Sequence, residues 1–483
     1  MTAMSTSRAL PSLSLPTTSD VGFTGYKLAL FFVVNIGLAL LMQKSGAFAT
    51  VHAVLTLTVG VWYATRGGSL ERVAWVAAYM IGTEIIWRMA GARLPWEFAK
   101  YATSAVFILA MFRNGLLKGP ALPTIYVLLL IPSAVLTAME LDNDEARSAI
   151  SFYLSGPIAL TASAWFFSQV KLTTQQLATL FLALLGPIAG IAAIALYGIL
   201  TDPNIMYGFS ATSNYATSGG YAPNQVSSLL GLGALLALFF VLDERGGWTR
   251  RIGFISGATV FAIQSALTFS RGGLYNIAVA LLLALPFLIR DPRTRLRVIL
   301  VAVILVVATN YVILPRLEAF TRGNLSNRFE SVETTGREDL SRADLQLWQE
   351  HPLLGVGPGM AELNRESSLK GIAAHTEFSR LVAEHGTLGF AALLALLLAG
   401  VQCVLSARGN TNKAVVAALL GWSLFDMLHG AMRMGAPGFL FGLAFASVVP
   451  AGSAAIVYVL KRRRSSALRG RRVGRLTDQT DVG

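Results

Sequence analysis

Three polar segments of this chain carry residue types that could act on an anionic substrate. Arg271 lies in TFSRGG, Arg337 lies in TGREDL, and His375 opens HTEFSRLVAEHG. A guanidinium group keeps its charge and presents paired N–H donors that match phosphate oxygens. A neutral imidazole titrates near pH ~6.5 and can take a proton from a sugar hydroxyl group. These residues together would suit chemistry between a phosphate-containing substrate and a hydroxyl group.

Arg337 is predicted to lie in the first turn of a helix. Thr335 and Glu338 have the spacing of a capping box, which would start a helix at Arg337 that runs to about Glu350. Free backbone N–H groups and the positive end of the helix dipole would add to the arginine charge and favour phosphate oxygens. A surface arginine paired with Glu338 or Asp339 is the alternative, and spacing alone leaves both open.

A glycine-rich turn follows this helix. Gly355 and Gly357 in GVGPG remove side-chain bulk, which would let the backbone approach a ligand. Glycine serves tight chain reversal equally well. The spacing is not that of a dinucleotide-binding loop, and no hydrophobic strand precedes it. Substrate binding and chain reversal therefore both stay open for this turn.

His375 is one of five histidines, and an interfacial histidine is more often structural than catalytic. The other four are His52, His351, His385 and His429. We expect alanine substitution of His385 or His429 to have a much milder effect than that of His375. For Glu384, just before the next apolar run, we predict only a role in orienting this region.

Arg271 falls between the apolar runs 253–269 and 273–290, at the predicted membrane boundary. An arginine near hydrocarbon is costly and usually faces a cavity, a partner or a functional site, unless it snorkels to the lipid headgroups. Arg271, Arg337 and His375 come from three separated segments, and all three fall on the same predicted side of the membrane. This convergence favours one shared site.

Composition decides the class of protein that must position these residues. The chain is 54% hydrophobic and 13% charged, with a mean hydropathy of +0.59, whereas an ordinary soluble domain has about 25% charged residues. Apolar runs of about 17–25 residues recur along it, each long enough to cross a bilayer as a helix. The sequence therefore predicts an all-α, polytopic membrane protein with about 12–14 transmembrane helices.

We place about fourteen spans, at 26–43, 48–64, 72–91, 97–114, 122–140, 149–168, 176–200, 224–243, 253–269, 273–290, 296–313, 386–405, 413–430 and 437–460. The same pattern gives a disordered N-terminal tail, an N-terminal transmembrane bundle, a second transmembrane region and a basic C-terminal tail. Their boundaries are 1–25, 26–200, 201–460 and 461–483. The second region includes a large periplasmic or extracellular loop, 314–385, with short helices.

Lysine and arginine collect in alternate connections, which assigns those connections and both termini to the cytoplasm. Much of the net charge of +13 lies there, so we expect contact with anionic membrane lipids and no nucleic acid partner. Arg88, Arg93 and Lys100 break the rule, because they fall on the outer side. Either the spans around them differ from the prediction or these charges have a task there. The single cysteine, Cys403, excludes an intrachain disulfide and a cysteine-built metal site.

Several segments resemble the hallmark segments of the O-antigen ligase and polymerase superfamily. They are SRGG at 270–273, the stretch from GREDL to GVGPGM at 336–360, HTEFSRLVAEHGTLG at 375–389, and YAPNQVSSLLGLG at 221–233, which includes Asn224. The resemblance covers about residues 200–430. The chain has His375-Thr376 where many members have His-Asn, and more predicted spans than the usual dozen. These departures concern the acceptor side more than the donor side.

The resemblance implies an inverting glycosyltransferase at the outer face of the bacterial inner membrane. Members move a glycan from undecaprenyl diphosphate to a hydroxyl group of lipid A-core, of the next lipid-linked repeat, or of a protein. By resemblance, Arg271 and Arg337 would hold the leaving diphosphate in place of a metal, and His375 would position or deprotonate the acceptor. The predicted substrate-binding residues are Arg271, Arg337, Gly355, Gly357, Asn224 and Glu384. No cofactor and no metal are implied.

The implied partners are the undecaprenyl diphosphate-linked glycan donor, a glycan or lipid A-core acceptor, membrane lipids, and a chain-length regulator or other assembly proteins of polysaccharide and lipopolysaccharide biosynthesis. A lipid or sugar transporter or flippase is the alternative, with the outer arginines as its vestibule. Transporters tend to show internal repeats and charges near the membrane midplane. Here the polar residues gather on one face, which favours glycosyl transfer. Polymerase and ligase stay open, as do the glycan and the acceptor.

Overall fold

The computed structural model describes residues 25–450, apart from short gaps at 68–69, 117, 203–208, 211, 243–246, 291, 331–335 and 367. The two predicted tails therefore lie outside the described residues, except that Gly25 begins the first helix.

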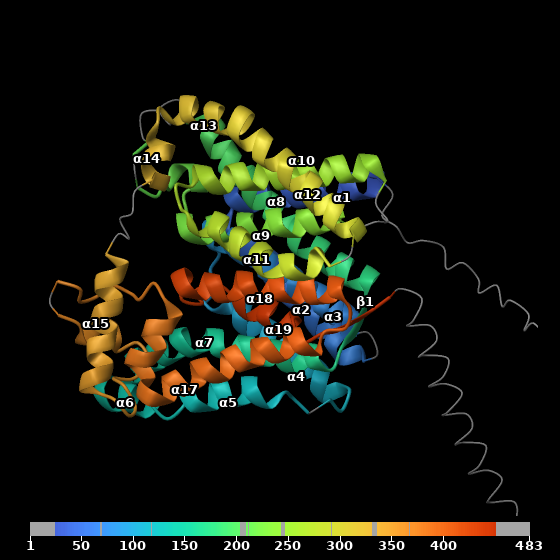
Figure 1. The fold of residues 1–483 in the computed structure, drawn as a ribbon. Coiled ribbons are helices and arrows are strands. Elements are labelled where there is room, and N and C mark those ends of the chain that lie inside the picture. Colours follow the sequence, from blue (N-terminus) through green and yellow to red (C-terminus); the bar gives the residue numbers. More distant parts are fainter. Residues whose placement is uncertain are drawn as a thin grey trace, which may run out of the picture.

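The described chain is a bundle of helices (Figure 1). Its first part consists of α1 (Gly25–Lys44), α2 (Gly46–Arg66), α3 (Leu70–Met89), α4 (Phe98–Arg113), α5 (Ala121–Leu130), α6 (Ala134–Glu140), α7 (Asn143–Ser168), the strand β1 (Lys171–Thr173) and α8 (Thr174–Thr201). A 3-10 turn, Ala216–Ser218, leads to α9 (Pro223–Leu242), α10 (Trp248–Leu267), α11 (Gly272–Leu288) and α12 (Pro292–Ala308). A π-helical turn, Thr309–Ile313, joins α12 to α13 (Leu314–Thr321). The last elements are α14 (Asn324–Glu330), α15 (Arg337–Glu350), α16 (Ala361–Asn364), α17 (Glu377–Ser406), α18 (Asn410–Gly430), α19 (Ala436–Leu443) and the strand β2 (Ser447–Val449).

Eight helical segments of the described chain are long and apolar enough to span a membrane. They are Gly25–Lys44, Gly46–Arg66, Ala121–Glu140, Asn143–Ser168, Thr174–Thr201, Pro223–Leu242, Thr294–Thr321 and Glu377–Ser406. The all-α, polytopic membrane class is therefore confirmed. The other predicted spans correspond to helices that are shorter or less apolar, namely α3, α4, α10, α11, α18 and α19.

The last predicted span, 437–460, is not one helix over its described part. The helix α19 ends at Leu443, and Ser447–Val449 form β2, which pairs in parallel with β1. Backbone N–H and C=O groups of β2 are thus bonded to a neighbouring connection instead of continuing a helix. The prediction was wrong here because apolar composition alone does not distinguish a short helix followed by a strand from one long helix.

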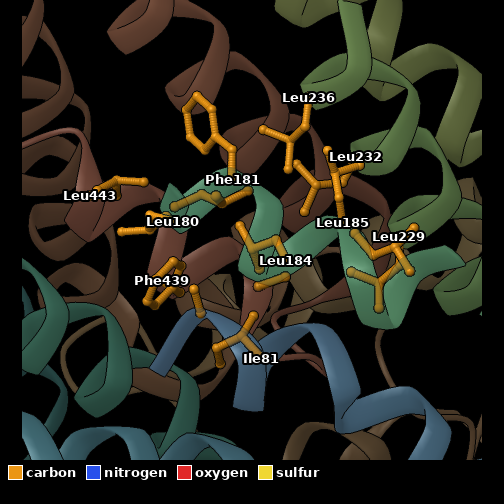
Figure 2. Packing of buried hydrophobic residues seen from close by; sticks show 14 of the residues in the cluster. Ile81, Leu180, Phe181, Leu184, Leu185, Leu229, Leu232, Leu236, Phe439 and Leu443 are labelled. Carbon is orange, nitrogen blue, oxygen red and sulfur yellow. The ribbon is translucent and has the colours of Figure 1, made fainter. Parts of the chain in front are cut away.

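The helices α8 and α9 form the centre of the bundle and share one buried cluster with Ile81 of α3 and with Phe439 and Leu443 of α19 (Figure 2). Their labelled residues in that view are Leu180, Phe181, Leu184, Leu185, Leu229, Leu232 and Leu236. Small residues bring helices close, as is usual in membranes: a Cβ atom on Gly190 of α8 would lie 2.5 Å from the Cβ atom of Ala39 of α1. The surrounding helices pack against this buried centre.

Connections gather at the two ends of the bundle. We call the end that carries α6, α14 and α15 the loop end, and the opposite end carries the β1–β2 pair (Figure 1). At the loop end, the N–H group of Asn214 donates to the carbonyl of Thr268 at 2.9 Å, and Nε of Arg328 donates to the carbonyl of Phe269 at 3.0 Å. Segments that are distant in sequence therefore meet around the turn between α10 and α11.

Two of the three charges that break the basic-residue pattern have tertiary side-chain contacts at the loop end. Nη1 of Arg88 donates to Oε1 of Gln225 at 3.1 Å, and Nζ of Lys100, which is 1% exposed, donates to Oγ of Ser155 at 2.9 Å. Arg93 is exposed. Two of the three exceptions are thus interior groups that bind other helices.

Candidate functional site

The SRGG segment forms a tight turn between α10 and α11. Gly273 lies against α9 so closely that a Cβ atom there would be 2.0 Å from the carbonyl oxygen of Ser227. The N–H group of Gly273 donates to Oγ of Ser227 at 3.1 Å, and that hydroxyl donates to the carbonyl of Ser270 at 2.9 Å. Arg271 is the residue before α11 begins, so its backbone position is fixed by this contact with α9.

The other side of the turn rests on α18. A Cβ atom on Gly272 would lie 2.4 Å from Cε1 of His429. Nε2 of His429 donates to Oδ1 of Asn276 at 3.0 Å, because an amide oxygen can only accept. Nδ2 of Asn276 in turn donates to Oδ1 of Asp426 at 3.0 Å. His429 therefore packs against the turn that carries Arg271. Because of this contact, we no longer expect His429→Ala to have a mild effect on activity.

Arg337 is the first residue of α15, as the sequence predicts, but the predicted capping box is wrong. The N-cap is Gly336, with φ of 74°, and the described residues make no side-chain cap hydrogen bond there. Thr335 lies outside the described residues, and Glu338 lies 3.7 Å from Nη2 of Arg342 instead. A glycine cap leaves the first N–H groups of the helix available beside the Arg337 guanidinium.

Two contacts hold α15 in place. Its apolar side, with Leu340, Ala343 and Leu347, is buried. Asp344 pairs with Arg365 at 2.6 Å, and both side chains are almost fully buried. These contacts fix the orientation of α15, and therefore also the backbone orientation of Arg337, its first residue.

Arg337 and His375 line one pocket of about 260 Å³ at the loop end. The pocket is also lined by Ser341, Thr376, Phe378, Ser379 and Leu428. Oγ1 of Thr376 accepts a hydrogen bond from the N–H group of Phe378 at 3.2 Å and caps α17. His375 thus directly precedes a capped helix, facing the start of α15.

The charges around this pocket are mainly positive. Burial lowers the pKa of Arg337, and the charges of Arg271, Arg328 and Arg433 lower it further. Arg271 and Arg337 are therefore close enough to repel each other, although they come from different segments. Repulsion among fixed cations in a half-buried place is relieved by an anion, so the pocket suits a strongly negative ligand.

The imidazole of His375 is uncharged at neutral pH. Burial lowers its pKa to about 4, and the nearby charges of Arg433, Arg337, Arg365 and His429 add to this effect. Its Nδ1 atom is buried and has no hydrogen-bond partner among the described residues. The pKa of about 6.5 expected for an unperturbed side chain does not apply here, because burial and then three guanidinium groups oppose the charging of the ring.

Glu384 lies apart from the pocket in a buried ion-pair network. Arg380 bridges Glu384 and Glu377 at 2.5 Å each, and all three side chains are 2% exposed or less. This network holds the first turns of α17, before the break at Gly386 with φ of 61°. The predicted orienting role fits this position, whereas the predicted contact with substrate does not, because the carboxylate is enclosed.

Gly355 and Gly357 are explained by chain packing. The N–H groups of Val356 and Gly357 donate to the carbonyls of Ala383 and Glu384 at 3.0 and 2.9 Å. Both glycines are buried and have φ of 65° and 98°. A Cβ atom on Gly355 would lie 2.3 Å from the carbonyl oxygen of Ala383. Packing against α17 therefore accounts for both glycines, and their contact with a substrate stays a prediction.

Asn224 is half-buried in the first turn of α9, where its Oδ1 atom accepts from the N–H group of Gln225 at 3.0 Å. It does not line the pocket of Arg337 and His375. The structure also brings in Arg328 and Arg433, whose charges reach Arg337 and which the sequence analysis missed. Arg433 follows α18, in the connection between the predicted spans 413–430 and 437–460. No group of three or more His, Cys, Asp or Glu side chains that could hold a metal lies in the described ranges.

A comparison with known protein families decides how this pocket is interpreted. Residues 258–394 match the model of the O-antigen ligase family. This match supports membership of the O-antigen ligase and polymerase superfamily. It contains Arg271, Arg337 and His375, but not Arg433 or the N-terminal bundle. No curated protein matches the chain.

Proposed function

We propose that the protein is an inverting glycosyltransferase of the O-antigen ligase and polymerase type. Its donor would be a glycan on undecaprenyl diphosphate, and its acceptor a hydroxyl group on the outer face of the bacterial inner membrane. The observation that carries the proposal is the shared pocket of Arg337 and His375, with Arg271 near enough to lower the pKa of Arg337. It supplies anion-binding groups and a neutral base in one place.

The arginines would act on the leaving group. As the bond between the anomeric carbon and the diphosphate oxygen breaks, negative charge grows on that oxygen. Arg271 and Arg337 would stabilise this charge with fixed positive groups, the task that a divalent metal performs in many sugar transferases. The half-buried setting strengthens this electrostatic effect relative to water.

His375 would act on the acceptor. The acceptor oxygen forms the new bond to the anomeric carbon from the side opposite the diphosphate, which inverts the configuration. Its proton passes to an imidazole nitrogen of His375, which is neutral and able to accept it. The products are the glycosylated acceptor and undecaprenyl diphosphate, so the lipid-linked donor supplies the energy.

The test uses purified protein in detergent or lipid with a lipid-linked donor, an acceptor, and a chelator in parallel samples. We expect Arg337→Ala and Arg271→Ala each to lose about 10²–10³ in rate, as for the loss of one transition-state contact. Arg→Lys should rescue poorly, because an ammonium group does not reproduce the planar fork. Arg147→Ala, an exposed arginine of α7, is the matched control. Near-normal transfer by both alanine variants would refute the diphosphate role, and loss on chelation alone would point to a metal.

A further inference from the structure

The N-terminal bundle contains a cluster of buried charges beside the loop end. Oε1 of Glu84 and Nη2 of Arg88 lie 2.5 Å apart on α3, with side chains 3% and 8% exposed. Lys100 on α4 is 1% exposed. Buried charges are expensive unless they are paired and hydrogen-bonded, so their contacts show what they hold.

All three side chains bind the turn between α18 and α19. Nη1 and Nη2 of Arg88 both donate to the carbonyl of Arg433 at 3.2 Å. Nζ of Lys100 donates to the carbonyl of Met432 at 3.2 Å. The N–H group of Gly435 donates to Oε2 of Glu84 at 2.7 Å. We call residues 431–435 the clamp turn.

The clamp turn has a backbone that needs outside support. Ala431 and Met432 have φ of 51° and 47°, in the left-handed region that side chains with a Cβ atom rarely adopt. Such residues persist where the surrounding structure fixes them. The bonds from Glu84, Arg88 and Lys100 supply that support.

The side chain of Arg433, in the clamp turn, reaches the segment directly before His375. Nη2 of Arg433 donates to the carbonyl of Ala374 at 2.9 Å and to that of Ala373 at 3.4 Å. These are the two residues directly before His375. The contacts therefore run from α3 and α4 through the clamp turn to the backbone directly before His375.

We propose that Arg433 is a positioning residue for His375, and that Glu84, Arg88 and Lys100 hold it in place. The N-terminal bundle is then part of the catalytic unit, although the family match covers only residues 258–394. This inference rests on the proposed function, because it assigns Arg433 to the base of that reaction. It also explains why Arg88 and Lys100 depart from the usual distribution of basic residues.

Arg433 has a second effect that a purely structural residue would lack. The cationic and titratable groups whose charges act on the imidazole of His375 are Arg433, Arg337, Arg365 and His429. Tyr153, Glu362 and Tyr221 face Arg433 from α7, α16 and the loop before α9. Removing the positive charge of Arg433 should raise the pKa of His375, whereas a lysine at this position should keep it low.

The experiment compares Arg433→Met, Arg433→Lys, His375→Ala and the control Arg147→Met in the full-length protein. For each we would measure kcat, KM for the lipid-linked donor, and kcat/KM from pH 4 to 8. We expect Arg433→Met to lose about 10² in kcat, the scale of a misplaced catalytic group, with donor KM little changed. The acid limb of its kcat/KM profile should shift to higher pH, starting from about pH 4 in the native protein. Arg433→Lys should lower kcat because the lysine side chain is shorter and ends before the position of Nη2, while the acid limb of its pH profile stays in place.

Arg88→Lys extends the test to the N-terminal bundle, since it keeps the charge beside Glu84 but loses the two-point contact with the carbonyl of Arg433. It should lower kcat without a change in donor KM. Normal kcat and an unshifted acid limb in Arg433→Met, or normal kcat in Arg433→Lys if the methionine variant does not fold, would overturn the inference. Full activity of His375→Ala would instead refute the proposed base, so the two failures are distinguishable.

Discussion

At the scale of single residues, the environment of His375 changes the expected pH dependence. The imidazole pKa is lowered to about 4 by burial and by the charges of Arg433, Arg337 and Arg365. Such a ring remains a free base from neutral pH down to about pH 5. Its proton affinity is therefore lower than that of an unperturbed imidazole, and the ring stays uncharged in a cationic pocket.

We therefore expect kcat/KM to stay flat as the pH falls through 6.5 and to decline only near pH 4. The unfolded chain binds a proton at His375 near pH ~6.5, so this residue also makes the fold less stable as the pH falls from ~6.5 toward 4. Initial rates in parallel with thermal unfolding separate the two effects. A rate decline centred near pH ~6.5 would contradict the low pKa.

The choice of histidine control also follows from the structure. His385 is fully buried and bonds Ser133 through Nδ1, and His429 touches Gly272. Both would disturb packing if shortened. We expect His351→Ala, at an exposed position, to retain normal transfer while His375→Ala loses about 10²–10⁴ in rate. Glycan transfer measured with each variant checks this, and equal losses would point to a general effect of histidine removal.

At the scale of elements, the glycine pair of the SRGG turn fixes Arg271. Gly273 has no room for a Cβ atom beside Ser227. This close backbone contact and the hydrogen bonds of the Ser227 hydroxyl group join α9 to the turn between α10 and α11. The position of Arg271 therefore depends on two backbones that touch, and not on its own side-chain contacts alone.

Gly273→Ala should destabilise the protein by about 1–3 kcal/mol, since overpacking forces the backbone apart, and should lower transfer as Arg271 moves. Gly257→Ala is the matched control, because it lies within α10 with nothing near its missing Cβ atom. That change should be neutral or slightly stabilising. Tryptophan fluorescence during heating gives the stability, and equal melting of the two variants would count against the packing account.

At the scale of the whole molecule, the site depends on one end of the bundle lying outside the cytoplasm. The basic connections predict this orientation through the positive-inside rule. The loop end joins the segments that carry Arg271, Arg337 and His375, so one assignment of sides applies to all three.

Reporter fusions test this topology. A reporter fused after Arg293 should be active in the cytoplasm, and one inserted at the exposed Lys370 should be active on the outer side. A second insertion at Asp142, also exposed, should agree with Lys370. If the reporters after Arg293 and at Lys370 gave the same side, the proposed outer-face reaction would fail.

The membrane class could be predicted from the sequence, and three residues could be proposed for the site, because both depend on local properties. Long apolar runs require helices in a bilayer whatever their neighbours are. An arginine at the start of a helix and a histidine before one are equally local features. Sequence patterns and the family resemblance therefore sufficed to propose Arg271, Arg337 and His375. The structure brings these three residues to one end of the bundle.

Only the tertiary structure decided which residues surround them. The packing of Gly355 and Gly357 depends on the approach of α17. The low pKa of His375 depends on burial and on arginines from three separate segments. The contacts of Arg88 and Lys100 with residues 432 and 433 span more than 300 positions of sequence. No local pattern encodes such contacts, because they arise from the packing of whole helices against one another.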